Sequence, residues 1–216
     1  NKNFRITLVD RNNYHFFPPL LYQVATSFIQ ASNISYPFRR MISTFKNVHF
    51  HMGTFRQVFP EQNMIETDTG NIVYDYLIIA HGTETNFFSM DNVRKCALPM
   101  KSIEEALFIR NHVLLKLEEA ARNTDVRNAQ RLQNIVIAGG GPTGVELAGM
   151  IAEMGKYIAQ KEYPEIKLDN SNLYLIDALP SLLAPMSKMA QESAYETLKK
   201  LGVKIILNVS VKDYVD

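Results

Sequence analysis

The sequence predicts an α/β protein built on parallel sheets, with an antiparallel meander in its first half. From residue 134 onward, short apolar stretches alternate with segments of helical spacing, the pattern of strand–helix–strand units with parallel strands. Residues 45–80 instead carry a dense series of short strands separated by turn residues, which is typical of antiparallel pairing. We therefore divide the chain into two parts, residues 1–98 and residues 99–216.

The first part begins with a β-branched strand at residues 4–10, which ends in Asp10. The meander that follows is expected to contain strands at 48–52, 55–59, 64–68 and 72–74, and to end in the apolar strand 76–80. Strands this short and this closely spaced leave room only for tight turns.

The second part begins after Pro99 with a helix from Ser102 to about Asn123, opened by a capping box between Ser102 and Glu105. The polar residues 123–133 are expected to form a surface connection. Strands at 135–138, 173–176 and 203–209 then alternate with helices at 143–160 and 187–200. Such units predict right-handed crossovers between parallel strands.

Composition and charge exclude several classes of protein. Apolar residues are 46% and charged residues 21% of the chain, which are ordinary values for a globular domain. The net charge is +1 and no basic tract is longer than Arg39-Arg40, so we expect no nucleic-acid partner. No apolar run reaches the roughly 18 residues that would span a bilayer. The single cysteine, Cys96, excludes an internal disulfide and a dithiol catalyst within this chain.

The two ends of the sequence predict an internal piece of a longer protein. The first strand has no Met and no polar lead before it, and the last strand is followed by only a few residues. A metal site is not expected either. His49 and His51 share one face of a strand, but nothing nearby supplies the further ligands that a metal needs.

A glycine-rich turn between the strand at 135–138 and the next helix matches G-x-G-x-x-G. Its residues are Gly139, Gly140, Gly141, Pro142, Thr143 and Gly144. The first glycine of this motif permits a tight turn, the second lets a pyrophosphate approach the backbone, and the third lets helix and strand pack closely. The start of the helix then faces the diphosphate. We predict a Rossmann-type dinucleotide site; the alternative is a glycine turn that binds nothing.

Two carboxylates belong with this turn. Asp177 ends the next strand, 33 residues after Gly144 (177 minus 144), and is the candidate ligand of the adenosine ribose, although the usual interval is about 20 residues. The polar stretch 156–171 accounts for the excess, and a carboxylate without a following Arg favours NAD over NADP. Otherwise Asp177 is a strand-end turn residue. Glu146 either completes a capping box with Thr143 or lies beside the bound dinucleotide.

The first part has features of a second nucleotide site that lacks its first strand and glycine turn. Asp10 is expected to hold a ribose, and Arg11 to cover an adenine face. Small residues around His81, namely Ala80 and Gly82, allow close approach of the backbone to a ligand.

Four segments together resemble the type II NADH dehydrogenases, which are single-subunit flavoprotein NADH:quinone oxidoreductases with two dinucleotide-binding domains. These segments are residues 9–11, 17–26, 74–82 and 139–149. The run Pro19-Leu-Leu-Tyr-Gln-Val-Ala-Thr26 is the most specific of them. The resemblance implies FAD and NAD(H) as cofactors and a truncated FAD/NAD(P)-binding two-domain fold, with a partial FAD domain at 1–98 and an inserted NAD(H) domain at 99–216.

The resemblance also implies roles for individual residues. Asp10 and Arg11 match the flavin-nucleotide contacts, Pro19 matches the loop beside the isoalloxazine ring, and Phe55 matches a backbone contact to the adenine. Residues 80–82 match the family's A-T-G flavin contact, although His81 stands at the usual Thr. Glu146 matches the glutamate placed at the nicotinamide.

The implied activity is hydride transfer from NADH to FAD, followed by reduction of a membrane quinone. The parent protein is expected at the cytoplasmic face of the membrane, as a peripheral protein attached through a carboxy-terminal segment that this sequence lacks; the fragment itself is expected to be soluble. A homodimer is left open. Two alternatives also remain: an NADH-binding module without turnover, and a soluble flavoprotein reductase that passes electrons to a protein acceptor.

Overall fold

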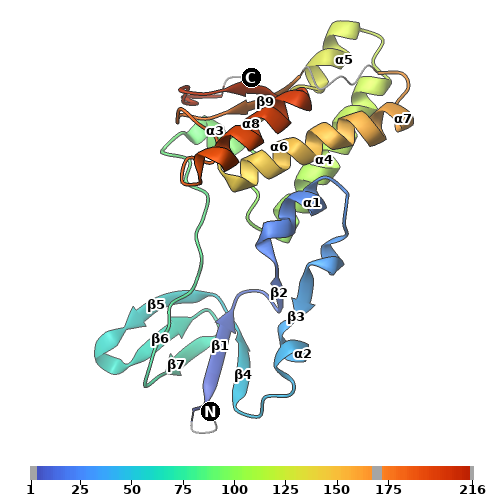
Figure 1. Ribbon diagram of the computed structural model, residues 1–216. Helices are drawn as coiled ribbons and strands as arrows, with labels where there is room; N and C mark the ends of the chain where they lie inside the picture. Colours follow the sequence, from blue (N-terminus) through green and yellow to red (C-terminus); the bar gives the residue numbers. More distant parts are fainter. Residues whose placement is uncertain (1–3, 167–171, 215–216) are drawn as a thin grey trace. The chain divides into compact units, whose positions relative to one another are not determined.

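The computed structural model describes residues 4–166 and 172–214, and these form two compact units (Figure 1). The first unit comprises the described residues up to Phe17 together with Ser32–Glu84. The second comprises Pro18–Ala31 and the described residues from Thr85 onward. Each unit contains parallel strands, and the first also has an antiparallel meander, so the predicted α/β class is confirmed.

The first unit is built from three small sheets and one short helix. Its elements are β1 (Ile6–Asp10), β2 (Tyr14–Phe16), β3 (Ser35–Pro37), α2 (Phe38–Ile42), β4 (Val48–Met52), β5 (Phe55–Phe59), η3 (Pro60–Gln62), β6 (Met64–Thr67) and β7 (Gly70–Val73). The 3-10 turn η2 (Ala31–Asn33) lies at its boundary. Helix α2 packs on β4, where Phe38 and Phe50 stack with ring centroids 5.0 Å apart.

The expectation that residues 48–52 belong to the meander is wrong. Strands β5, β6 and β7 form the antiparallel meander, but β4 pairs in parallel with β1, in register from Ile6 opposite Val48 to Asp10 opposite Met52. Close spacing in the sequence does not decide pairing, because the partner of a strand depends on tertiary packing as well as on local sequence. As a result, β1 and β4 end at the same edge.

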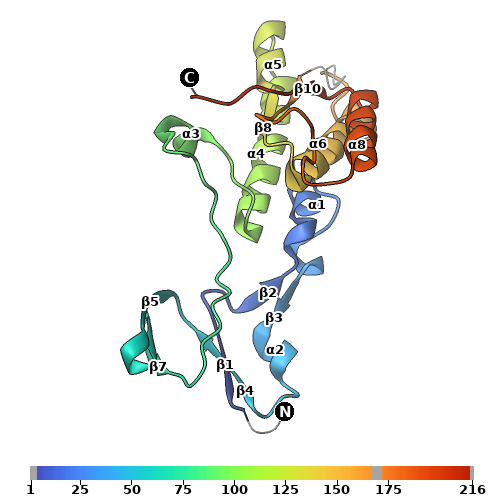
Figure 2. The same cartoon turned by 60° about the vertical axis from the view of Figure 1, so that its left-hand side comes forward.

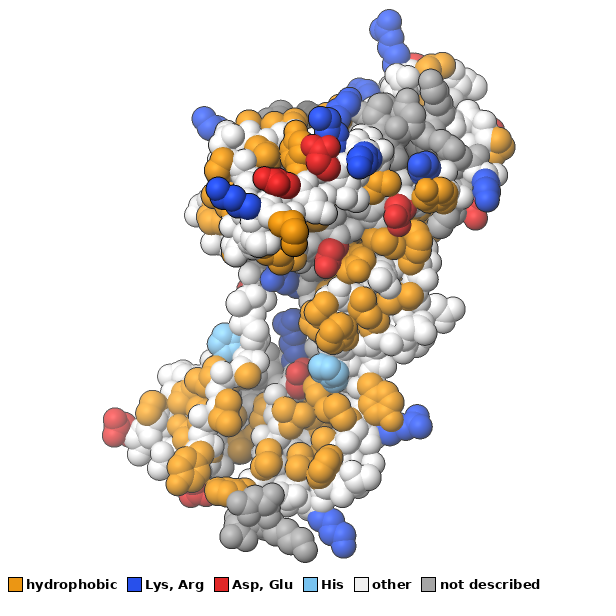
Figure 3. All heavy atoms as spheres, viewed as in Figure 1, with side chains coloured by type: hydrophobic (Ala, Val, Ile, Leu, Met, Phe, Trp, Pro, Cys, Tyr) orange, Lys and Arg blue, Asp and Glu red, His pale blue; other side chains and the backbone are white. Residues whose placement is uncertain are grey.

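The apolar run Tyr76–Ala80 is not a strand, contrary to the sequence expectation. Its side chains are largely open to solvent, Ile78 being 89% exposed. A strand requires a neighbour for its backbone N–H and C=O groups, and none of the described strands is paired with this run. Figure 3 shows hydrophobic side chains over the visible face of the first unit.

The second unit contains a three-stranded parallel sheet in the order β10-β9-β8. Figure 2 shows β8 and β10 of this sheet next to helices α6 and α8. Its elements are η1 (Pro18–Leu20), α1 (Leu21–Ala25), α3 (Asp91–Cys96), α4 (Ile103–Ala121), α5 (Val126–Leu132), β8 (Ile135–Ala138), α6 (Pro142–Met154), η4 (Gly155–Ala159), α7 (Gln160–Glu162), β9 (Leu173–Ile176), α8 (Lys188–Lys200) and β10 (Lys204–Ile206). The strands predicted at 135–138 and 173–176 are confirmed, and the last strand is shorter than expected.

Helices α6 and α8 pack together and enclose the core of this unit with the sheet. Leu175 of β9 is fully buried, and Leu198 of α8 is 2% exposed. Helix α1 packs against α4 and α6, so the segment that carries Pro19 is grouped with the second unit rather than with its sequence neighbours.

Helix ends follow their capping residues. The Ser102–Glu105 capping box at the start of α4 is confirmed, since Glu105 N donates to Ser102 Oγ at 3.2 Å and the Glu105 side chain accepts from Ser102 N. The connection expected at 123–133 is largely exposed, as predicted, but it contains helix α5, whose start is capped by Asp125 Oδ1 accepting from Arg127 N at 2.9 Å. The helix expected at 143–160 is regular only to Met154 and continues as a π-helical turn.

Candidate functional site

The glycine turn directly follows β8 and opens α6. Gly139 has a φ of +116°, a conformation that glycine adopts without steric cost, and its N–H donates to Ile176 O at 2.8 Å. Gly141 is the N-cap residue of α6 and Pro142 the first helical residue, and no side chain caps this helix start. The first N–H groups of the helix therefore keep their capacity to bind an anion.

The second and third glycines of the motif meet different environments. A Cβ atom added to Gly144 would overlap with the carbonyl oxygen of Gly139, so this position lets the helix approach the turn, as expected for the third glycine. A Cβ added to Gly141 would have no heavy atom within 4 Å. Gly141 thus faces open space, where the second glycine of the motif is expected to admit a pyrophosphate.

Glu146 does not cap the helix, contrary to one of the two sequence interpretations. Because α6 begins at Pro142, Thr143 is its second residue and makes no capping bond. Glu146 lies in the second turn, and its side chain is exposed. Nearby protein removes part of the water around it, and this desolvation raises the pKa of the Glu146 carboxyl above its usual value of 4.5.

The structure brings Asp177 to the glycine turn. Strand β9 pairs with β8 with Ile176 opposite Ala138, so Asp177 follows at the same sheet edge as Gly139. Its half-buried carboxylate accepts two backbone bonds, from Gly140 N to Oδ2 and from Leu179 N to Oδ1, the latter at 2.6 Å. The long interval before Asp177 includes η4 and α7; residues 167–171 of the polar stretch lie outside the described residues.

The contribution of Gly140 was missed by the sequence reasoning, which gave roles to the first, second and third motif glycines only. Gly140 is buried, and a Cβ added to it would lie 2.6 Å from Leu182 Cδ2 and 3.0 Å from Asp177 Oδ2. Its carbonyl accepts from Leu183 N at 2.8 Å. The one available signal was the run of three glycines, whose middle member the motif leaves unspecified.

The first unit brings together several of the residues predicted to contact a flavin nucleotide. Asp10 ends β1, its backbone oxygen accepts from Gly53 N at 2.9 Å, and its Oδ1 accepts from Asn12 N at 2.8 Å. Phe55 opens β5 two residues after Gly53, and its ring stacks on His81 at 6.5 Å between centroids with planes 7° apart.

The remaining predicted flavin contacts are exposed. Gly82 has a φ of +76°, the turn geometry that a small residue permits. The side chains of Arg11 and Ala80 are exposed. Pro19 is also exposed and belongs to η1 in the second unit.

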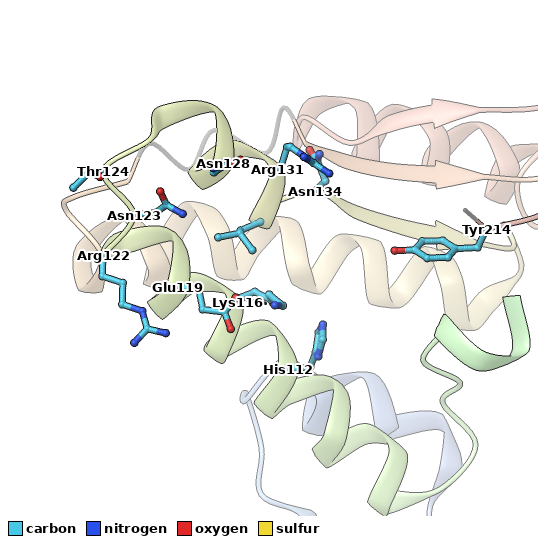
Figure 4. A pocket seen from close by; sticks show the side chains of 11 residues that line it. His112, Lys116, Glu119, Arg122, Asn123, Thr124, Asn128, Arg131, Asn134 and Tyr214 are labelled. Atoms are coloured by element: carbon cyan, nitrogen blue, oxygen red, sulfur yellow. Dashed lines mark hydrogen bonds and ion pairs between the residues drawn. The ribbon is translucent and has the colours of Figure 1, made fainter. Parts of the chain in front are cut away.

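A separate polar pocket of about 880 Å³ lies between α4 and α5 (Figure 4). Lys116 and Glu119 form an ion pair of 2.7 Å on its wall. The other lining residues are His112, Arg122, Asn123, Thr124, Asn128, Arg131, Leu132, Asn134 and Tyr214. None of the predicted site residues lines this pocket.

No helix within 4–166 or 172–214 combines the length and hydropathy needed to cross a bilayer. In the same residues, no three His, Cys, Asp or Glu side chains are grouped so that they could hold a metal ion.

Comparisons with known proteins agree with one another. The profile of the pyridine nucleotide-disulphide oxidoreductase family matches residues 1–216. Two type II NADH:quinone oxidoreductases of Mycobacterium tuberculosis are 34% and 32% identical to the chain over 212 and 210 residues, which are 96% and 95% of this chain but 46% and 45% of the relatives. The chain thus spans about half the length of the curated relatives it matches.

Solved structures show the same relationship. NDH2 of Plasmodium falciparum in complex with NADH superimposes with a TM-score of 0.89 at 25% identity, over 99% of this chain and 45% of that one. The sulfide:quinone oxidoreductase of Aquifex aeolicus, at 21% identity and a TM-score of 0.74, covers 99% of this chain and 47% of its own length and shares the fold.

Proposed function

Because this chain belongs to the pyridine nucleotide-disulphide oxidoreductase family, we propose that it forms the NADH-binding part, and a portion of the FAD-binding part, of an NADH:quinone oxidoreductase. We propose residues 99–216 as the NAD(H) domain and residues 1–98 as the partial FAD domain. The relatives named as type II NADH:quinone oxidoreductases support this assignment.

The glycine turn carries the NADH proposal. The start of α6 has no side-chain cap, Gly141 faces open space, and Asp177 lies against the turn. In this proposal the pyrophosphate binds the free N–H groups of the helix start, and the adenosine ribose binds Asp177. Gly139, Gly140, Pro142, Thr143 and Gly144 supply the remaining backbone of the site.

The FAD proposal is supported by the nucleotide end of the first unit. Asp10 lies at the end of β1, and the stacked pair of Phe55 and His81 provides an aromatic surface. These residues fit a ribose and an adenine, with Arg11, Ala80 and Gly82 beside them in the sequence. We propose that Pro19 contacts the isoalloxazine ring.

The chemistry is that of the cofactors, because bound NADH would supply a hydride and bound FAD would accept it. The protein orients the two cofactors and provides a group that can hold or release a proton. We propose that Glu146 lies at the nicotinamide. Its raised pKa lets the carboxyl hold a proton at higher pH than an ordinary glutamate, which suits a group that donates or accepts one.

The chain has one cysteine, Cys96, so electrons do not leave through a dithiol of this chain. We propose a quinone as acceptor, in line with the relatives' names. For the full-length protein, we propose the cytoplasmic face of the membrane and a second copy of the chain as further partners.

The decisive experiment measures flavin and quinone activity separately. The purified 216-residue chain is expected to bind NADH, and a stoichiometric flavin spectrum would exclude the reading of a nucleotide module without turnover. The full-length protein is expected to reduce a short-chain quinone faster than a ferredoxin-type protein acceptor. The opposite preference would support a soluble reductase and contradict the quinone assignment.

A further inference from the structure

We propose that Asp177 is a positioning residue for the phosphate-binding turn, in addition to its role as ribose ligand. In this inference the carboxylate fixes the backbone of Gly140 and so couples the ribose half of the site to the phosphate half. The inference rests on the proposed binding of NADH at the glycine turn. It gives Asp177 a second role besides the binding of the ribose that the sequence predicts.

Both backbone groups of Gly140 are held by the loop that Asp177 opens. Gly140 N donates to Asp177 Oδ2, and Gly140 O accepts from Leu183 N at 2.8 Å. Gly140 itself is buried, so a lost partner would leave a backbone N–H unsatisfied away from water, which is costly. The turn therefore takes its conformation from this loop.

The loop is in turn anchored on the sheet and in the core. Asp177 N donates to Ile206 O at 2.9 Å, and Val209 N donates to Asp177 O at 3.1 Å. Leu182 is 1% exposed and belongs to the core cluster beneath the turn. Because both ends of the Gly140–Asp177 bond are fixed to packed elements, the carboxylate cannot shift without moving the glycine backbone.

The two tasks of Asp177 are compatible. An ionised carboxylate offers about four acceptor positions, and Gly140 N and Leu179 N occupy two of them, one on each oxygen. Each oxygen keeps capacity for one further donor, which matches the two hydroxyls of a ribose. The sequence interpretations of Asp177 as turn residue and as ribose ligand are therefore not exclusive.

Asparagine provides the sharpest substitution because it keeps the shape of Asp177 but accepts hydrogen bonds at one atom only. In Asp177→Asn, either Gly140 N or Leu179 N must face an NH2 group, so one of the two backbone bonds is lost. Glu192→Gln is the matched control: it also removes one negative charge, from an exposed position on α8.

The test compares NADH with an NADH analogue whose adenosine ribose lacks both hydroxyls, by calorimetric titration of the wild-type chain and the two variants. The analogue cannot bond the carboxylate, so any effect of Asp177→Asn on it acts through the turn. We expect Asp177→Asn to weaken the analogue on the order of tenfold, and Glu192→Gln to change it by less than about twofold.

The titrations distinguish a failure of the positioning role from a failure of the proposed NADH site. If Asp177→Asn weakens NADH but leaves the affinity of the analogue unchanged, the positioning role is wrong and the ribose role stands. If the wild-type chain binds neither ligand, the proposed NADH site itself is wrong.

Amide hydrogen exchange provides a measurement that does not depend on a variant that folds. In the wild-type chain, the Gly140 amide is expected to be protected from exchange, as is the Gly139 amide bonded to Ile176. In Asp177→Ala, which removes both acceptor oxygens, Gly140 should lose protection while Gly139 keeps it, since global unfolding would expose both. Exchange of Gly140 at the rate of an open loop in the wild type would overturn the inference.

Discussion

At the scale of single residues, the position of Glu146 separates a structural from a chemical role. Helix α6 starts at Pro142 without a side-chain cap, so a carboxylate in its second turn contributes nothing to the helix start. Desolvation raises the pKa of the Glu146 carboxyl, because the surrounding protein disfavours the ionised form relative to the protonated form. A perturbed carboxyl pKa is one feature that functional groups share.

We predict that Glu146→Gln slows the reduction of bound flavin by NADH in the full-length protein by about tenfold or more, with a smaller change in NADH affinity. Stopped-flow absorbance of the flavin measures the rate, and titration measures the affinity. Glu153→Gln, on the same helix, is the control. Equal rates in both variants would leave Glu146 without a catalytic role.

The raised pKa also predicts a pH-dependent effect on stability. Ionised Glu146 is disfavoured in the folded state, so its unfavourable contribution is absent below the unfolded pKa of 4.5 and fully present above the raised folded pKa. Glu146→Gln should therefore increase the free energy of unfolding more at pH 7 than at pH 4. Urea unfolding at the two pH values measures this, and a larger benefit at pH 4 would contradict the assigned direction.

At the scale of elements, the glycine turn shows which features of local geometry a sequence motif can predict. The spacing of Gly139, Gly141 and Gly144 correctly predicted a turn, an open position and a close contact, because each requirement follows from backbone geometry. A fourth role, that of Gly140 against Leu182 and Asp177, depends on a loop about forty residues away in sequence, which no local pattern contains.

We predict a large loss of stability from one alanine substitution in this turn and a small loss from another. Gly144→Ala places a methyl group on the carbonyl oxygen of Gly139 and should destabilise the chain by about 3 kcal/mol or more. Gly141→Ala meets open space and should cost about 1 kcal/mol or less as a change of N-cap residue, yet weaken NADH. Thermal unfolding and NADH titration of both variants test this; similar melting temperatures would contradict the assigned environments.

The capping signals provide a second example at this scale. Ser102 with Glu105 predicted the start of α4 because both hydrogen bonds are local in sequence. The cap of α5 by Asp125 was equally local, but the helix behind it is polar and was interpreted as a connection.

Loss of the Ser102 cap should destabilise the chain measurably. We expect Ser102→Ala to lower the free energy of unfolding by about 1 kcal/mol, because Glu105 N loses its side-chain acceptor. Ser193→Ala, at an exposed position inside α8, should cause no loss, since alanine favours helix interiors. Denaturant unfolding measures both, and an equal loss in the two variants would show that the cap contributes nothing.

At the scale of the whole molecule, the sequence predicted the class of fold better than its pairings. The parallel strands β8 and β9 were recognised because their apolar runs alternate with helices. The parallel partner of β4 was not, because β1 lies some forty residues earlier and the choice depends on tertiary contacts. The run Tyr76–Ala80 was predicted as a strand from its apolar residues alone, although it is exposed and unpaired within the described chain.

The same limit applies to the sites. Residues within one motif, such as Gly139 and Gly144, could be assigned from spacing. The stacking of Phe55 on His81 joins positions 26 residues apart (81 minus 55), and only the folded first unit brings them together. Residues 18–31 lie between two segments of the first unit and yet pack with α4 and α6, which composition does not reveal.

In our proposal, the start of α6, with Asp177 beside it, binds the diphosphate and ribose of NADH. Calorimetric titration of the 216-residue chain with NADH tests this most directly, with Gly141→Ala and NADPH as comparisons. We expect NADH to bind saturably at one site per chain. NADPH should bind the wild-type chain more weakly, because its 2′-phosphate meets the Asp177 carboxylate. NADH should also bind Gly141→Ala more weakly than the wild-type chain. If the folded chain shows no saturable binding of NADH up to millimolar concentration, the start of α6 is not an NADH site.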